Sequence, residues 1–328
     1  MGTRFRLPRL QLAALAAVVG AAQWLWGSAD WRWWSIAACA AVAFIQAAHI
    51  LPWTPLWPKS VRTATSNKEM QYLTLMVSNV LTPNRNAQGL LEQIHEHQPE
   101  IVLTLESDAW WGSSSRPPRR GMAVQRPNTS RQSLWHASLF ANSPRRDRGQ
   151  VADPERYSVD SHLAAYAMRR TNPLPCPAPA PPAPSESEQS LWRDAELLLV
   201  GKDIHRHEQP TLLAGDLNDV AWSRTTRRFC RVSGMLDPRR GRGMFSTFHA
   251  SYPLIRWPLD HIFISEHFTL VNMQRLKNFG SDHFPIIATL CYRPARADEN
   301  DTPEADREER KEATETIEEA RQQGDGEA

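Results

Sequence analysis

The chain has 328 residues, a formal net charge of +2 and a hydrophobic share of 41%, which is enough for the core of one domain of roughly 220 residues. Its four cysteines have neither the paired spacing of a zinc site nor that of a disulfide framework. A small fold held together by zinc or by disulfides is therefore excluded. Residues 295–328 carry a net charge of −8 and the remaining residues +10. The body therefore suits an anionic partner, and the tail is predicted to be solvated and disordered, with at most transient helix over 304–323.

The N-terminus contains two apolar stretches, residues 7–26 and 33–51, each close to the roughly 20 residues that a helix needs to cross a bilayer. Seven of the thirteen tryptophans lie before residue 60, clustered at the ends of these stretches, as in interfacial belts. We expect residues 1–58 to be a membrane anchor, a transmembrane hairpin in the lipid bilayer, followed by a linker over 59–71. The competing interpretation is an alanine-rich signal peptide, although no small-residue cleavage site follows the first stretch.

Positive charge flanks the two stretches unevenly. Arg4 and Arg6 precede the first stretch, Arg9 lies at its start, and three basic residues follow the second, whereas the turn between them offers only Arg32 beside Asp30. This bias favours both ends on the cytoplasmic side of a bacterial-type inner membrane, as in a multi-pass protein. If only one stretch crosses, the domain lies outside.

A strand, helix and strand are predicted after the linker. An apolar run over 72–79 ends in Asn79, and a second run over 100–106 ends in Glu106. Between them, residues 87–98 have the spacing of an amphipathic helix that stops before Pro99. Polar groups thus stand at equivalent strand ends, where a parallel sheet collects its functional groups.

Three acidic motifs follow in the second half of the chain: Gly215-Asp216-Leu217-Asn218-Asp219, Leu259-Asp260-His261 and Gly280-Ser281-Asp282-His283-Phe284-Pro285. Each follows an apolar run (211–214, 255–259 and 271–279), so we expect each acidic residue at the end of a strand. Carboxylate and amide oxygens suit magnesium, and an imidazole suits proton transfer near neutral pH. The pattern predicts a metal-assisted hydrolase, although Asp-Leu-Asn-Asp alone is also typical of a turn, and Asp282-His283 of a helix start.

On a strand, Asp216 and Asn218 would share one face, as water-polarising base and as donor to a phosphoryl oxygen. His283 would act as general acid or base, oriented by Asp260.

Taken in order, Asn79, Glu106, Asp216-x-Asn218, Asp260 and Ser281-Asp282-His283 resemble the endonuclease/exonuclease/phosphatase superfamily over residues 72–292. The resemblance implies a four-layered α/β sandwich, two central sheets flanked by helices, as a domain over 72–294. It also implies that Glu106 binds Mg²⁺, or Mn²⁺ as an alternative, supported by Asn79 and Asp282. By the same resemblance His283 contacts the scissile phosphate. No obligate protein partner is evident.

One family residue is not found. Relatives carry a further histidine between the Glu and Asp-x-Asn motifs, and Ala178 stands at the expected position, in a stretch with seven prolines in residues 173–184. His136 and His162 are the possible substitutes. Three arginine clusters, at 116–131, 145–148 and 224–231, would suit nucleic acid, whereas the anchor would suit a phosphorylated lipid or small molecule. The alternative to an enzyme is an inactive member of the fold that binds phosphorylated ligands or an anionic membrane surface.

Overall fold

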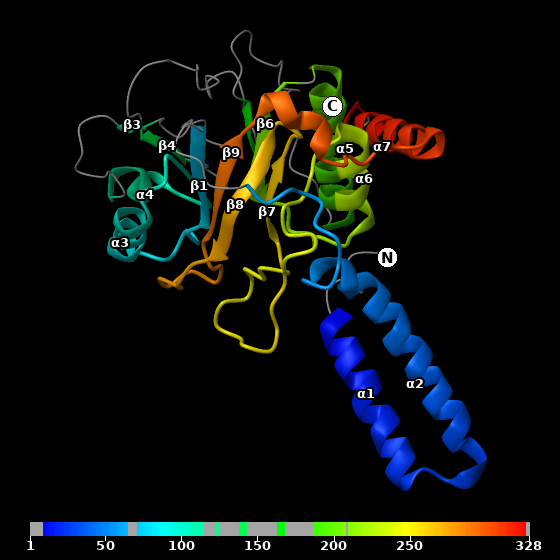
Figure 1. Ribbon diagram of the computed structural model, residues 1–328. Helices are drawn as coiled ribbons and strands as arrows, with labels where there is room; N and C mark the ends of the chain where they lie inside the picture. Colours follow the sequence, from blue (N-terminus) through cyan, green and yellow to red (C-terminus); the bar gives the residue numbers. More distant parts are fainter. Residues whose placement is uncertain are drawn as a thin grey trace. The chain divides into compact units, whose positions relative to one another are not determined.

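The computed structural model describes residues 9–64, 71–114, 122–124, 138–142, 163–167, 186–207 and 209–325 (Figure 1). The chain forms two compact units. The first consists of residues 1–59 together with 239–244, and the second of residues 60–238 together with 245–328. The short return of the chain to the first unit at 239–244 has no counterpart in the sequence prediction.

The first unit contains two long helices, α1 (Arg9–Trp26) and α2 (Ala29–Ile50), followed by the 3₁₀ turn η1 (Leu51–Trp53). The helices contact each other at both ends: Arg9 donates from Nη1 to Gln46 Oε1 at 3.1 Å, and the rings of Trp24 and Trp33 lie 5.7 Å apart. Of the described helices, one is long and apolar enough to cross a membrane, namely α2 with η1, Ala29–Trp53. An N-terminal signal sequence can have the same length and apolar composition.

Residues 239–244 join this unit by a close backbone approach. Gly241 donates its N–H to Pro52 O at 2.9 Å, and its φ is +76°. A Cβ at this position would lie 2.6 Å from Pro58 O, so glycine is required for steric as well as conformational reasons. The Arg239 guanidinium lies over the Trp53 ring at 5.7 Å.

The second unit is built on two sheets. The larger contains β1 (Gln71–Asn79), β2 (Ile101–Leu105), β3 (Met122–Val124), β4 (Ser138–Asn142), β8 (Phe268–Arg275) and β9 (Ile286–Tyr292), in the order β3-β4-β2-β1-β9-β8. The smaller contains β5 (Leu163–Ala167), β6 (Thr211–Asp216) and β7 (Asp260–Ile264) in chain order. Only β1 and β2 pair in parallel among these described strands; the other pairings are antiparallel.

Successive side chains of a strand point to opposite faces of its sheet. One core therefore lies between the two sheets, and one lies on the outer face of each sheet. Leu75 and Val77 of β1 share one buried cluster with Ala214 and Ile262 of the smaller sheet, so the two sheets face each other. The alternate β1 residue Met76 belongs instead to an outer cluster.

Helices cover both outer faces. On the larger sheet these are α3 (Ala87–His97), through Leu90 and Ile94, and the short α4 (Ala109–Ser114), through Trp111. On the smaller sheet, Leu213 and Phe263 pack against α5 (Glu186–His207) and α6 (Arg224–Ser233). Helix, sheet, sheet and helix layers follow one another in Figure 1, which confirms the predicted four-layered sandwich.

The acidic tail is not disordered where the structure describes it, so that prediction was wrong. After the 3₁₀ turn η3 (Pro294–Glu299), helix α7 (Arg307–Asp325) packs Ala313 and Ile317 against α5 and α6. Its carboxylates pair with the arginines of α6: Glu312 with Arg224 at 2.6 Å and with Arg228, and Glu309 with Arg231. The high charge that predicted a solvated segment is matched by a basic helix, which composition alone does not reveal.

Candidate active site

Five strands bring the predicted residues to one edge of the two sheets. Strands β1 and β6 end in Asn79 and Asp216, and β2 ends one residue before Glu106. Strand β7 begins with Asp260, directly opposite Asp216, and β9 begins three residues after His283. The prediction that Asp260 and Asp282 close strands was therefore wrong. Because β7 and β9 run antiparallel to β6 and β1, their starts meet the ends of those strands.

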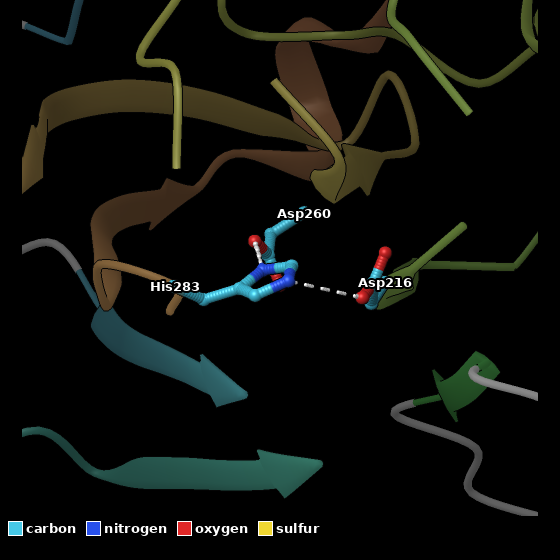
Figure 2. A group of neighbouring side chains, drawn as sticks. All are labelled: Asp216, Asp260 and His283. Carbon is cyan, nitrogen blue, oxygen red and sulfur yellow. Dashed lines mark hydrogen bonds and ion pairs between the residues drawn. The ribbon is translucent and has the colours of Figure 1, made fainter. Parts of the chain in front are cut away.

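The His283 imidazole lies between two carboxylates, as Figure 2 shows. Its Nδ1–H donates to Asp260 Oδ2 at 2.7 Å, and Nε2 lies 3.7 Å from Asp216 Oδ2. All three residues are buried, with exposed fractions of 1% for each aspartate and 4% for the histidine. We call Asp216, Asp260 and His283 the sealed side of the site.

Burial and close charges shift the pKa values on the sealed side. Burial and the charge of Asp260 raise the pKa of Asp216 to about 7. Burial disfavours the His283 cation, but the charge of Asp260 and its hydrogen bond, with the charges of Asp216 and Asp282, outweigh it and raise the His283 pKa to about 10. At neutral pH the histidine is therefore cationic, and Asp216 is poised to take up or release a proton.

A serine holds the loop that carries the histidine. Ser281 Oγ donates to the Asn79 carbonyl at 2.7 Å and accepts from the His283 N–H at 3.0 Å. The preceding Gly280 has a φ of +111°, and a Cβ there would lie 2.8 Å from Asn84 Oδ1. In the Gly-Ser-Asp-His motif, the glycine is thus required by the backbone conformation and the serine by the hydrogen bonds that hold the loop. Pro285 precedes a strand, so the helix-start interpretation of this motif does not apply.

Glu106 and Asp282 are half-buried, and we call them the open side of the site. The Asn79 amide joins the two sides: Nδ2 donates to Glu106 Oε1 at 2.8 Å and to Asp216 Oδ2 at 3.2 Å. Burial raises the pKa of Glu106, the Asn79 hydrogen bond and the His283 charge oppose this rise, and the charges of Asp282 and Asp260 add to it. A cation would relieve that repulsion, so the two half-buried carboxylates fit a hard divalent metal. The Asn79 amide turns its nitrogen toward Glu106, while its Oδ1 accepts from the Leu81 N–H at 3.1 Å.

Two site residues have a left-handed backbone: φ is +55° at Glu106 and +48° at Asn218. Asn218 lies two residues beyond the end of β6, and its N–H donates to Asp216 Oδ1 at 2.8 Å. The prediction that Asp216 and Asn218 share a strand face was therefore wrong, since the chain turns between them. Left-handed non-glycine residues of this kind are typical of functional sites, where the surrounding structure holds them in place.

Some neighbours of the site carry no motif that sequence analysis could have used. The Phe248 ring lies 4.9 Å from the His283 ring, between their centroids, and the Asp260 N–H donates to Thr247 Oγ1 at 3.3 Å. Their only signal is their place ahead of β7. The residues considered for the missing histidine, Ala178, His136 and His162, lie outside the described residues, as do the arginine clusters at 116–131 and 145–148.

Within the described part of the chain, one group of metal-type ligands is compact enough to hold an ion by itself. It consists of Asp216, Asp260 and His283, whose ligand atoms all lie within 4.8 Å of one another. The sealed side and the open side are thus both candidates for a metal, and they differ in chemistry: the first would use an imidazole, the second oxygen atoms alone.

Several solved structures resemble this chain. An endonuclease/exonuclease/phosphatase family protein from Bacteroides thetaiotaomicron has a TM-score of 0.48 and 15% identity, over 69% of this chain and 97% of that one. A mannosyl-6-phosphatase from the same organism has a TM-score of 0.47 and 14% identity, over 66% and 99%. D. rerio TDP2 with a single-strand DNA product has the same TM-score and identity, over 67% and 99%.

A search of curated proteins found no matching sequence. The model of the Endonuclease/Exonuclease/phosphatase family matches residues 76–283, a range that contains every candidate site residue from Asn79 to His283. That range is more than half of the chain, and this chain therefore belongs to the endonuclease/exonuclease/phosphatase family.

Proposed function

We propose that this protein is a membrane-attached, Mg²⁺-dependent phosphoesterase that cleaves a phosphodiester or phosphomonoester by attack of water. The observation that carries the proposal is the continuous contact from Asp260 through His283 to Asp216, and from Asp216 through Asn79 to Glu106. It joins a buried acid–base group to an oxygen-lined cation site. Membership of a family of phosphate-ester hydrolases supports the same reading.

Glu106 would hold the metal, with Asn79 and Asp282 supporting it. When bound, a divalent cation supplies charge for a phosphoryl oxygen. We favour this position over the sealed side because the His283 Nδ1–H already donates to Asp260. Magnesium also prefers oxygen ligands and keeps several waters, for which a half-buried glutamate leaves room. Mn²⁺ would be accepted by the same oxygens.

The pKa directions assign the proton-transfer roles. Asp216, with a pKa raised to about 7, would accept the proton of the attacking water. His283, cationic at neutral pH, would contact the scissile phosphate, stabilise its developing charge and protonate the leaving oxygen. Asp260 would hold the imidazole through Nδ1, so that Nε2 faces the reaction. The Asn218 amide would donate to a phosphoryl oxygen.

Membrane attachment rests on the helix Ala29–Trp53, and the exposed rings of Trp26 and Trp34 near the α1–α2 turn fit an interfacial position. From the charge bias at the two ends we infer that α1 crosses the membrane as well as α2, a multi-pass anchor that would put the catalytic unit on the cytoplasmic side. Alkaline extraction of membranes tests this: an integral protein stays in the pellet, whereas release into the supernatant would argue against the anchor.

Turnover by the purified full chain is the test of the catalytic proposal. A generic phosphodiester, a phosphomonoester and a phospholipid would each be assayed with Mg²⁺ and with a chelator. Asp216→Asn should abolish hydrolysis, and Glu92→Gln, an exposed acid on α3, should not. Absence of turnover in a folded, metal-binding wild type would instead favour an inactive member of the fold.

A further inference from the structure

A loop with exposed apolar side chains lies beside the site. Ahead of β7, residues 249–256 extend beyond the strand ends of the sandwich, as the yellow loop in Figure 1. Three of their side chains are largely in solvent: Leu254 is 85% exposed, Tyr252 55% and Ile255 45%. Exposed apolar residues that adjoin one another in this way are a feature of interaction surfaces.

Two arginines lie at the base of this loop. Arg256 and Arg275 both contact the ring of Phe284, with guanidinium carbons 4.9 Å and 4.3 Å from its centroid. Arg256 Nε donates to Tyr252 O at 3.1 Å, and Arg275 Nη1 donates to Ser246 O at 2.8 Å. Among the described residues, no carboxylate lies within ion-pair distance of either arginine.

The two cations repel each other. Burial lowers the pKa of Arg275, and the charge of Arg256 lowers it further. Carbonyl groups and an aromatic face hold the guanidinium groups in position without neutralising them, so an incoming anion would meet a preformed site.

This surface is connected to the candidate active site through the backbone. The Ala250 N–H donates to Asp282 O at 2.7 Å, and the Phe284 N–H donates to Thr247 O at 2.9 Å. Phe284 directly follows His283, and the Phe248 ring contacts the His283 ring. A ligand held by the arginines would therefore lie close to the reacting groups.

We propose that residues 249–256, with Arg256 and Arg275, form a binding site for the surface of an anionic phospholipid bilayer. Leu254 at the tip is 85% exposed, whereas Arg256 is half-buried and bonded to the Tyr252 carbonyl. That order matches a bilayer interface, where acyl chains lie deeper than headgroup phosphates. A nucleic acid would contact the arginines but would leave the aliphatic tip in water.

The proposal concerns binding and does not depend on turnover. If the proposed phosphoesterase function holds as well, the two together indicate a substrate phosphate at the bilayer surface, in a phosphorylated lipid.

Photo-crosslinking of the full chain in lipid nanodiscs tests the site directly. Leu254 would be replaced by p-benzoylphenylalanine, and Lys311, 76% exposed on α7, would be replaced in the same way as the control. In nanodiscs containing phosphatidylglycerol, lipid adducts at position 254 should clearly exceed those at 311. They should fall roughly fivefold for each of Arg256→Gln and Arg275→Gln, from the usual contribution of a basic residue near an anionic surface.

Charge-conserving variants separate binding from structural effects. Arg256→Lys and Arg275→Lys should retain most of the adduct, and Asp216→Asn, which removes the proposed base, should crosslink like the wild type. Equal labelling at 254 and 311 would overturn the proposal, and so would labelling that is the same in phosphatidylcholine alone. A wild-type chain that crosslinks to lipid at position 254 but hydrolyses none of the phosphate esters would count against the proposed function and leave the lipid site standing.

Discussion

The sealed side and the open side of the site differ in how far contacts within the protein satisfy their charged groups. On the sealed side, hydrogen bonds and burial already fix His283 between Asp260 and Asp216. On the open side, the carboxylates of Glu106 and Asp282 repel each other, and the Asn79 amide donates a hydrogen bond to Glu106. Under the proposed mechanism, the sealed side is prepared for proton transfer by the protein alone, whereas the open side requires a bound cation to neutralise charge.

The largest effect should come from the sealed side. His283→Gln removes the cation near the scissile phosphate, and we expect kcat to fall by roughly 10²–10⁴-fold, the usual contribution of a positioned acid. Steady-state kinetics of the full chain measures this, with circular dichroism to show that the fold is kept. Turnover near the wild-type value would remove His283 from the reaction.

Substitution on the open side should act through the metal. Glu106→Gln removes a charged ligand, so we expect Mg²⁺ to half-saturate activity at a concentration roughly tenfold or more higher. Mn²⁺ binding followed by paramagnetic resonance gives a readout that needs no turnover.

Asp260→Asn is the matched variant for that comparison. It should leave Mn²⁺ affinity close to wild type while lowering kcat. The reverse pattern, with affinity lost in Asp260→Asn and kept in Glu106→Gln, would move the metal to the sealed side.

Stability of the metal-free protein should depend on pH through His283. Its folded-state pKa of about 10 lies above the ordinary value of 6.5, so the folded state holds a proton that the unfolded chain has released between those two pH values. The stability that His283 contributes is then fully present below about pH 6.5 and falls with rising pH by up to about 1.4 kcal/mol per unit until pH 10. Asp216, whose pKa is raised to about 7, acts in the same direction at lower pH. Urea unfolding in a chelator at several pH values measures the slope. A slope that His283→Gln leaves unchanged would assign it to another group.

Much of the sandwich could be predicted from local pattern. The strand that ends in Asn79, the helix over 87–98 and the strand before Glu106 each have a clear period, and the structure places β1, α3 and β2 there. Strand direction could not be predicted, because it depends on pairing between distant segments. Asp260 and Asp282 were therefore identified as site residues but assigned to the wrong ends of strands.

The tail shows a second limit. Residues 295–328 have the composition of a disordered segment, yet α7 packs onto α5 and α6 through Ala313 and Ile317. Two apolar residues four apart in an acidic stretch are a weak signal, and the basic α6 helix lies more than seventy residues earlier in the chain. Pairing of this kind becomes visible only when the elements have been placed in space.

The smallest expected effect on kcat is that of Ser281→Ala. This variant tests whether Ser281 positions the His283 imidazole or only stabilises the fold. Ser281→Ala removes the hydroxyl that bonds both Asn79 O and the His283 N–H, and we expect a loss of about 1–3 kcal/mol in unfolding free energy. Ser265→Ala is the matched control, because its buried hydroxyl accepts from the Thr211 N–H at 3.0 Å at the far end of β6. Both variants should be destabilised to a similar extent in urea. Only Ser281→Ala should lower kcat, by a few-fold, since only that hydroxyl sets the position of the imidazole; equal kcat values in the two variants would reduce Ser281 to a structural residue.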